Sequence, residues 1–425
     1  MRYVSTATGF LLVLLLCLSV TPLTGADEKP QPKAKKAQPQ PVVKPEPEKE
    51  PVDPVDEPWP KTLGDPRAGE VPLPAAGDWR AFLVLDNKGV GVWTVKSFPV
   101  FPRLACPEVV GIDDHGRCLV LTNYSGKWAA LETIRDGAWL GGLEHGDLDP
   151  RIAGDELYTG SQLGNLYQVL AHPEGFLDNR RIAHFEGLAV NTLVAGELDD
   201  QPGRDLLVFT WPGGLWRVDP TGPHGTWVKT KLGDIEGRVR DAVVLPGPDR
   251  EVATVSRNGT VQLLRLTPEG PAWTKIYEAP MGMGRIALRP GSTRANTVLY
   301  TTHDDGRILR HVRPASGKWA TETIYLGPQG PRGIAAGRFF ADPKVESVAL
   351  YGYSGRVEIL SRKGDGAWKV ETVLKDPDKG HWVAVCEVDG RNATQELVAS
   401  GFGGRIVLLA RPVGYGRPEL AASED

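Results

Sequence analysis

Short runs in which apolar and polar residues alternate fill the chain from residue 77 to residue 412. None of these runs has the 3.6-residue period of an amphipathic helix, and Gly, Pro, Asp and Asn separate them, as they separate β-strands. One representative stretch contains four such runs, "NTLVAGELDD", "RDLLVFTW", "GLWRVDP" and "GTWVKTKL". The pattern predicts four strands per unit, named A, B, C and D in chain order.

The third run of each unit opens with the pattern Gly-x-apolar, and this pattern recurs at a nearly fixed period. The glycines are Gly116, Gly164, Gly213, Gly259, Gly306, Gly355 and Gly404. Their successive differences are 48, 49, 46, 47, 49 and 49 residues. Seven copies with four strands each are typical of a β-propeller.

A second series confirms the period independently, because a Trp opens the fourth run of most units. The series is Trp79, Trp128, Leu177 (the copy without its Trp), Trp227, Trp273, Trp319 and Trp368. The successive steps are 49, 49, 50, 46, 46 and 49 residues. Since outer strands lie far from the channel, we expect these rings to pack between neighbouring blades and not to bind a ligand.

The ends of the repeat region predict how the ring closes. The last unit has three runs, "HWVAVCEV", "QELVASG" and "GRIVLLA", and no fourth. The first run, "GDWRAFLVL", precedes the first complete unit. We therefore predict an all-β, seven-bladed β-propeller over residues 77–412 with four-stranded blades. Its N-terminal strand completes the last blade and removes the exposed edge.

The flanking segments predict an exported protein. Arg2, an apolar run too short to span a bilayer and small residues before Ala26 are typical of a signal peptide over residues 1–26. Residues 27–76 are rich in Pro, Lys and Glu and predict a disordered tether, and residues 413–425 form a tail. We expect a secreted or periplasmic monomer without a membrane span.

Charge and cysteine content exclude several classes of protein. The 49 Lys and Arg and 53 Asp and Glu residues are interspersed and give a net charge of −4, so no basic footprint for nucleic acid is present. Once the signal peptide is removed, Cys106, Cys118 and Cys386 remain. An odd number argues against a disulfide framework in an exported protein, and we expect these thiols to act as small apolar side chains.

Four of the junctions between A and B strands resemble FG-GAP/VCBS propeller repeats, in which an acidic Gly-Asp loop precedes an Asp-Leu-Val strand. The segments that carry the resemblance are "HGDLDPRIAGDELYTG", "VAGELDDQPGRDLLVF", "AGRFFADPKVESVALYG" and "CEVDGRNATQELVASG". The resemblance implies a secreted propeller used for adhesion or ligand binding, or occasionally as a lyase scaffold.

The same resemblance implies that these loops could bind calcium. The matching positions are Asp147, Asp149, Asp155, Glu197, Asp199 and Asp205. Three acids per loop offer fewer oxygens than calcium prefers. The alternative is that these acids form turns and accept backbone N–H bonds. No other cofactor is expected.

Aligning the A strands by the period places five polar side chains at one mouth of the channel. They are Asn191, Arg238, Arg285, Arg332 and His381, separated by 47, 47, 47 and 49 residues. In this alignment Arg240 has no periodic counterpart. The turns between B and C strands on the same face add Trp211, His303, Asp304, Asp305, Tyr353 and Phe402.

Converging guanidinium groups fit carboxylate, sulfate or phosphate groups, and aromatic side chains fit sugar rings. The leading hypothesis is a non-enzymatic module that binds an anionic glycan, or a protein partner, at the channel mouth. The alternative is a sugar lyase or dehydratase, with or without a metal ion, for which Glu144 and His145 offer a candidate base. A third interpretation is purely structural: the arginines bond carbonyls or acids of the neighbouring blade, such as Asp241.

Overall fold

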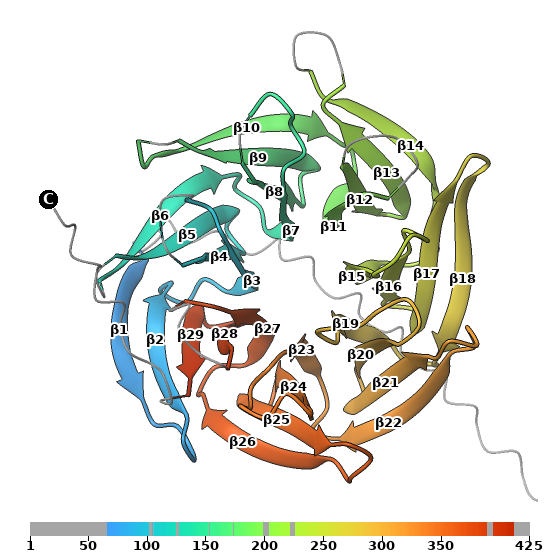
Figure 1. Cartoon of the computed structure of the whole chain (residues 1–425). Coiled ribbons are helices and arrows are strands. Elements are labelled where there is room, and N and C mark those ends of the chain that lie inside the picture. Colours follow the sequence, from blue (N-terminus) through green and yellow to red (C-terminus); the bar gives the residue numbers. More distant parts are fainter. Residues whose placement is uncertain are drawn as a thin grey trace, which may run out of the picture. The chain divides into compact units, whose positions relative to one another are not determined.

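The computed structural model describes residues 66–411 except 102–103, 105, 125–126, 153, 173, 199–203, 222–225 and 389–393. The predicted signal peptide, residues 27–65 of the tether and the tail lie outside the described residues. Seven β-sheets stand around a central channel like the blades of a propeller (Figure 1). None of the described residues belongs to a helix, so no helical segment among them could cross a lipid bilayer.

Six blades have four strands, which follow one another outward from the channel. Blade 1 contains β3 (Val92–Phe98), β4 (Glu108–Asp113), β5 (Arg117–Tyr124) and β6 (Lys127–Arg135). Blade 2 contains β7 (Leu140–Gly146), β8 (Glu156–Ser161), β9 (Asn165–Ala171) and β10 (Leu177–His184). Blade 3 contains β11 (Ala189–Gly196), β12 (Asp205–Trp211), β13 (Gly214–Asp219) and β14 (Val228–Asp234).

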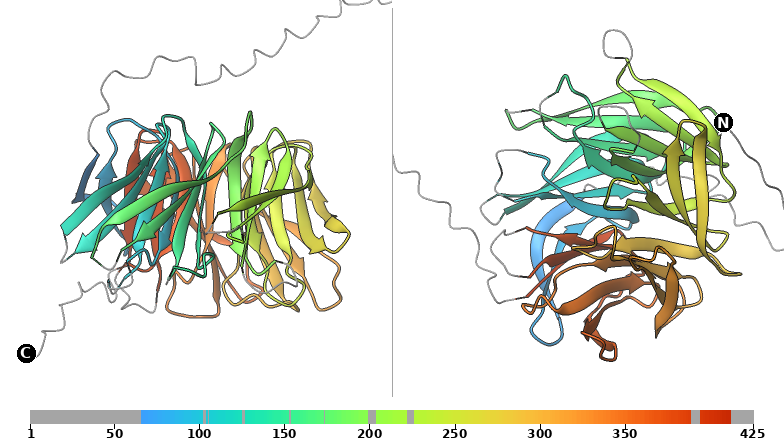
Figure 2. Two further views of the ribbon diagram at one scale, coloured as in Figure 1. Left: turned by 90° about the horizontal axis from the view of Figure 1, so that it is seen from above. Right: turned by 45° about the vertical axis from the view of Figure 1, so that its right-hand side comes forward.

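The next three blades repeat this order. Blade 4 contains β15 (Val239–Val244), β16 (Val252–Ser256), β17 (Thr260–Thr267) and β18 (Gly270–Glu278). Blade 5 contains β19 (Met283–Leu288), β20 (Thr297–His303), β21 (Arg307–Arg313) and β22 (Ala320–Leu326). Blade 6 contains β23 (Pro331–Ala336), β24 (Val345–Gly352), β25 (Arg356–Lys363) and β26 (Lys369–Lys375). The left view of Figure 2 shows the ring edge-on, with strand connections on its two faces.

Blade 7 joins the two ends of the repeat region and closes the ring. It contains β27 (Gly380–Cys386), β28 (Glu396–Gly401) and β29 (Arg405–Ala410), followed in space by β2 (Arg80–Asp86) and β1 (Arg67–Leu73). The predicted closure by the N-terminal strand is confirmed, because β2 pairs antiparallel with β29. The fifth strand, β1, was not predicted and occupies residues assigned to the tether, so the propeller begins before residue 77.

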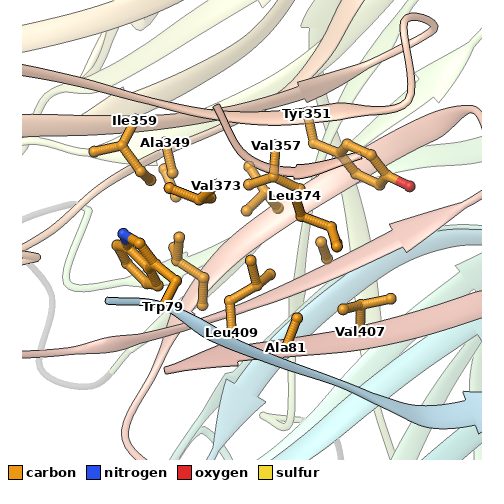
Figure 3. Close-up of a cluster of buried hydrophobic side chains, with 14 of the residues drawn as sticks. Trp79, Ala81, Ala349, Tyr351, Val357, Ile359, Val373, Leu374, Val407 and Leu409 are labelled. Atoms are coloured by element: carbon orange, nitrogen blue, oxygen red, sulfur yellow. The ribbon is translucent and has the colours of Figure 1, made fainter. Parts of the chain in front are cut away.

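The hydrophobic core is divided into seven layers, each between two neighbouring blades. Each layer contains one member of the Trp series, and Leu177 takes that place between blades 1 and 2. Trp79 packs in this way between blades 6 and 7, among Val373, Ile359 and Leu409 (Figure 3). The predicted packing role of the series is confirmed. Cys118 and Cys386 lie in two of the layers, and Cys106, Cys118 and Cys386 are not joined in disulfide bonds.

The repeated glycine of the B–C turn is required by the backbone. At Gly259 φ is +89°, and a Cβ there would lie 2.0 Å from the carbonyl oxygen of Ala279. At Gly164 φ is +79°, and a Cβ would lie 2.1 Å from the carbonyl oxygen of Phe185. In both blades this close approach carries a backbone hydrogen bond, from Ala279 N to Gly259 O and from Phe185 N to Gly164 O. Only glycine tolerates this combination of φ and contact.

An acidic residue at the start of the B strand explains the FG-GAP-like appearance of several junctions. The Glu156 carboxylate accepts a hydrogen bond from Leu148 N, Asp205 from Leu198 N, and Glu396 from Val388 N. Each acid therefore holds the backbone of the preceding A–B loop. This local role produces an acid before an apolar strand without any ligand.

Trp79 provides a direct test of closure. The change Trp79→Ala removes the indole side chain from the core layer between blades 6 and 7, next to the strand that closes the propeller. We expect the free energy of unfolding to fall by about 3–5 kcal/mol, as for other buried large-to-small changes. Urea unfolding followed by fluorescence measures this. The control is Trp211→Ala, whose side chain is 44% exposed and whose loss should cost under about 0.5 kcal/mol. Equal losses for the two variants would contradict the packing role.

Candidate functional site

Every inner strand carries a register shift near its start, at the same end of the channel. The shifts fall within Val92–Thr94, Leu140–Leu143, Val190–Thr192, Val239–Asp241, Met283–Ile286, Pro331–Gly333 and Gly380–Trp382. A β-bulge leaves a residue unpaired and changes the direction of its side chain. One residue from each shift defines what we call the bulge ring: Trp93, Gly141, Asn191, Arg240, Arg285, Arg332 and His381. The shifts in β7 and β19 also contain Gly142 and Gly284.

The bulge ring corrects the alignment made from the sequence. Arg240, not Arg238, is the bulge residue of blade 4. Arg238 lies two residues earlier, where blade 2 has Trp139. The sequence alignment failed because the spacing between bulge residues is uneven: Arg240 lies 49 residues after Asn191 and 45 residues before Arg285, so a uniform step of 47 residues selects Arg238. The position of the bulge in one blade cannot be read from the mean period of all the blades.

The B–C turns form a second ring around the first. In six blades a turn residue donates its backbone N–H to the carbonyl just before the bulge, as Arg257 does to Arg238 (2.9 Å) and Asp304 to Gly282 (2.9 Å). In blade 3, Trp211 pairs with Ala189 at the corresponding place. The members of this turn ring are Asp114, Gln162, Trp211, Arg257, Asp304, Tyr353 and Phe402.

The two rings surround a cavity of about 200 Å³ at the channel mouth. Its lining consists of Trp93, Thr94, Trp139, Leu140, Gly141, Asn191, Arg238, Arg240, Arg257, Arg285, Arg332, Tyr353, His381 and Phe402. The structure thus brings together all five residues that the sequence placed at the mouth, with Tyr353 and Phe402 from the turns. Trp211, His303, Asp304 and Asp305 are not part of the lining. His303 is fully buried and faces Asp305 at 2.6 Å.

Five guanidinium groups form one side of the cavity, which we call the guanidinium arc: Arg238, Arg240, Arg257, Arg285 and Arg332. One carboxylate faces them, because Asp304 accepts bonds from Arg240 (3.0 Å) and Arg332 (2.9 Å). Within the described part of the chain, no carboxylate oxygen lies within 4.0 Å of the Arg238, Arg257 or Arg285 guanidinium. Three of the five guanidiniums therefore have no carboxylate in direct contact, although the Asp241 carboxylate acts on Arg285 from a greater distance.

The arginines of this arc oppose one another electrostatically. Burial, and then the charges of Arg240 and Arg257, lower the pKa of Arg238 to about 10. Burial lowers the pKa of Arg285 to about 9, although the Asp241 carboxylate opposes the shift. A bound anion would offset both effects, since an opposite charge favours the ionised guanidinium.

Aromatic side chains form the other side of the cavity, the aromatic arc: Trp93, Trp139, Tyr353, His381 and Phe402. Trp93 lies 4.4 Å from His381 and 6.0 Å from Trp139 between ring centroids, and Phe402 lies 4.9 Å from His381. The two arcs meet at both ends. The Arg238 guanidinium lies 5.4 Å from the Trp139 ring, and that of Arg332 lies 4.8 Å from the Tyr353 ring. Cation–π contacts join the arcs into one wall.

The structural interpretation, in which these side chains join neighbouring blades, also holds in part, because residues of the bulge ring form hydrogen bonds to the next blade. Asn191 donates to the Val239 carbonyl, and Arg240 donates to the Met283 carbonyl at 2.8 Å. Asp241, however, accepts backbone N–H groups, from Ile286 at 3.1 Å and from Ala242 at 3.0 Å. It is therefore held by backbone groups, and burial raises its pKa. A guanidinium has five N–H donors, so an inter-blade bond leaves others free for a ligand.

His381 is a neutral member of the aromatic arc. Its Nδ1–H donates to the Trp93 carbonyl, which assigns the tautomer, because a carbonyl can only accept. Burial and the nearby Arg285 charge hold the pKa of His381 well below its usual range. Nε2 therefore keeps a free lone pair at neutral pH.

Glu144 and His145, the candidate base from the sequence, lie outside the cavity lining. Glu144 pairs with Lys96 at 3.2 Å, and the His145 ring packs on Phe98 at 4.1 Å between centroids. Burial opposes ionisation of Glu144, but Lys96 and His145 hold the pKa of this carboxyl below its usual range. A carboxylate whose pKa is lowered and which is paired with a cation accepts a proton weakly, so Glu144 is a poor general base.

The six acids suggested for calcium have separate surroundings. Asp149 is fully buried and bonds Arg180 at 2.7 Å, and Asp155 lies 3.8 Å from His145. Asp205 bonds backbone, Asp147 and Glu197 are exposed, and Asp199 lies outside the described residues. No three His, Cys, Asp or Glu side chains of the described residues gather as metal ligands. Calcium binding stays an untested expectation.

Comparison with known proteins shows the fold. No protein-family model matches the chain, and no match was found among curated proteins. The solved structures that resemble it include the BP39L lectin from Burkholderia pseudomallei, 14% identical with a TM-score of 0.57, over 76% of this chain and 97% of the lectin chain. The streptogramin B lyase is 12% identical with a TM-score of 0.52, over 78% and 97%. The WD40 propeller domain of Doa1 is 12% identical with a TM-score of 0.52, over 76% and 97%.

The raised pKa of Asp114, a member of the turn ring, can be tested through the pH dependence of protein stability. Burial and the neighbouring Asp113 carboxylate raise the pKa of Asp114 from 3.8 to about 7. A folded-state pKa above the unfolded value means that stability is lost as pH rises through this range. Asp114→Asn removes that loss. The unfolding temperature of the variant, relative to the parent, should therefore rise between about pH 4 and pH 7 and stay level above about pH 8.

The control for this measurement is Asp365→Asn, which removes an exposed carboxylate. Its unfolding temperature should follow the parent at every pH. If Asp114→Asn also follows the parent, the raised pKa is wrong.

Proposed function

We propose that this chain is an exported, non-enzymatic propeller that binds an anionic glycan at the channel mouth. One observation carries the proposal: a guanidinium arc and an aromatic arc enclose one cavity, and three of the guanidiniums lack a carboxylate partner among the described residues. A guanidinium presents two parallel N–H donors to a carboxylate, and an aromatic ring offers an apolar face to the C–H side of a sugar. The combination favours an anionic sugar over a neutral one.

The proposal also includes export of the protein and a likeness to FG-GAP/VCBS propellers. The signal-peptide pattern of residues 1–26 and the Pro-rich composition of residues 27–65 support a secreted or periplasmic module on a tether. The likeness to FG-GAP/VCBS repeats supports an adhesive role, although the acids that produce it hold loops in this chain. The lectin among the structural neighbours is consistent with sugar binding on a propeller, and at 14% identity it speaks for the fold alone.

The arginines can be tested together. The triple variant Arg238→Gln, Arg285→Gln and Arg332→Gln removes three positive charges from the cavity while keeping hydrogen-bonding side chains. Since a hydrogen bond to a charged group contributes roughly 1.5–3 kcal/mol, we expect affinity for anionic glycans to fall at least about a hundredfold. A glycan array followed by calorimetry on the best ligand measures this.

The matched control changes the same net charge elsewhere. Arg80, Arg338 and Arg356 are exposed and lie outside the cavity lining, so their replacement by Gln should leave affinity unchanged. The unfolding temperatures of both triple variants show whether the fold survives. Unchanged binding by the cavity variant, or an equal loss in the control, would contradict the proposed site.

His381 keeps the second candidate function, a sugar lyase, open. A lyase needs a base beside the group that neutralises the substrate carboxylate, and His381 lines the cavity together with Arg285 and Arg332. The binding proposal predicts no new unsaturated product when the protein is incubated with uronate oligosaccharides, with or without added divalent metal ions. Ultraviolet absorbance detects the double bond that elimination forms. Product that disappears in His381→Gln would replace the binding proposal with the lyase.

A further inference from the structure

Arg285, one of the lining residues, connects three blades at the cavity. The Arg285 guanidinium of β19 stacks on the Trp382 ring of β27, with 4.4 Å between the guanidinium carbon and the ring centroid. The same guanidinium donates to the Arg240 carbonyl at 2.8 Å. The Arg285 side chain comes from blade 5 and therefore contacts both blade 4 and blade 7 at the mouth of the channel. Gly333 on the intervening β23 has no side chain to obstruct this stack.

Charged side chains also lie deeper in the channel, beyond the Arg285–Trp382 stack. Lys96 of β3 and Glu144 of β7 form an ion pair at 3.2 Å. The Asp241 carboxyl of β15 is held by backbone N–H groups. A ligand chain that continued down the channel would have to displace the Arg285–Trp382 stack and then these groups. These contacts favour a blind cavity, which a ligand enters from the mouth face only.

The volume of the cavity limits the size of the ligand that can bind in it. The cavity has about 200 Å³, whereas pockets for drug-sized ligands have roughly 300–1,000 Å³. A single sugar ring is the unit of a glycan that suits so small a space. A blind cavity of this size can hold the end of a chain, but a ring linked on both sides would need a second exit.

One carboxylate of the protein already shows what the guanidinium arc accepts. Asp304 places its carboxylate between Arg240 and Arg332. Arg238, Arg257 and Arg285 form the rest of the arc and have no carboxylate partner among the described residues. A second carboxylate, supplied by a ligand, is the group that matches them.

We propose that the cavity binds the terminal unit of a glycan chain, one pyranose that carries a carboxylate, and excludes internal units. The inference deepens the proposed function and rests on it. The carboxylate lies against the guanidinium arc, and the sugar ring lies against the aromatic arc. The chain leaves through the mouth.

The experiment compares ligands that differ in the position and identity of the charge. Calorimetry is done with free glucuronic acid, with a trisaccharide that has glucuronate at its non-reducing end, and with a trisaccharide that has glucuronate between two neutral sugars. Glucose and glucose 6-sulfate complete the set. We expect the acid and the first trisaccharide to bind within about tenfold of each other, and the second trisaccharide to bind at least about a hundredfold more weakly.

The outcomes separate this inference from the proposed function. If the internal glucuronate binds as well as the terminal one, terminal recognition is wrong while anionic glycan binding stands. If the sulfate binds as well as the carboxylate, the assignment of the anion is wrong. If glucose binds as well as glucuronic acid, or no anionic sugar binds, the proposed function itself fails.

Two Trp variants place the sugar ring. Trp139 lines the cavity, and Trp211 belongs to the turn ring but lies outside the lining. We expect Trp139→Ala to weaken binding of free glucuronic acid by roughly tenfold and Trp211→Ala to change it by less than about twofold. A larger loss for Trp211→Ala would move the sugar out of the cavity and overturn the terminal pose. Unfolding temperatures of both variants show whether the fold is intact.

Discussion

The structure depends on the packing of each blade against the next. A four-stranded sheet has two faces and cannot bury either of them by itself. Each of the seven core layers therefore belongs to two blades, and each contains one Trp of the outer-strand series or Leu177. Removing one layer would expose the faces of two blades, so the ring must close. Closure by β2 places Trp79 in the layer between blades 6 and 7 (Figure 3).

This closed ring fixes the starts of seven strands at one mouth and leaves their side chains free to vary. The bulge in each inner strand occurs whatever residue it contains, from Gly141 to Arg285. Variation at equivalent positions produced three guanidiniums on blades 4 to 6 and aromatic groups on blades 7 and 1. The scaffold explains the positions, and the residue types explain the chemistry.

The fold could be predicted because backbone geometry requires its marker residues. Gly259 needs a positive φ beside a carbonyl, and the outer Trp rings fill the layers between blades, so both recur at the repeat period. The site was harder to predict. Arg240 was left out because it lies 49 residues after Asn191 but only 45 before Arg285, so a uniform step selects Arg238. Trp93 and Trp139 were missed because most other blades have no aromatic residue at the equivalent position, so no periodic signal marks them. β1 was assigned to the tether because its two strand-like residues, Val71 and Leu73, flank a Pro.

The central claim is that the two arcs form a single binding site for a carboxylated sugar. A crystal structure of the protein with glucuronic acid tests it most directly. The account predicts the ligand carboxylate within hydrogen-bonding distance of the Arg238, Arg257 or Arg285 guanidinium, with the sugar ring against the aromatic arc. Glucuronic acid bound elsewhere on the propeller, with those guanidiniums unchanged, would contradict it.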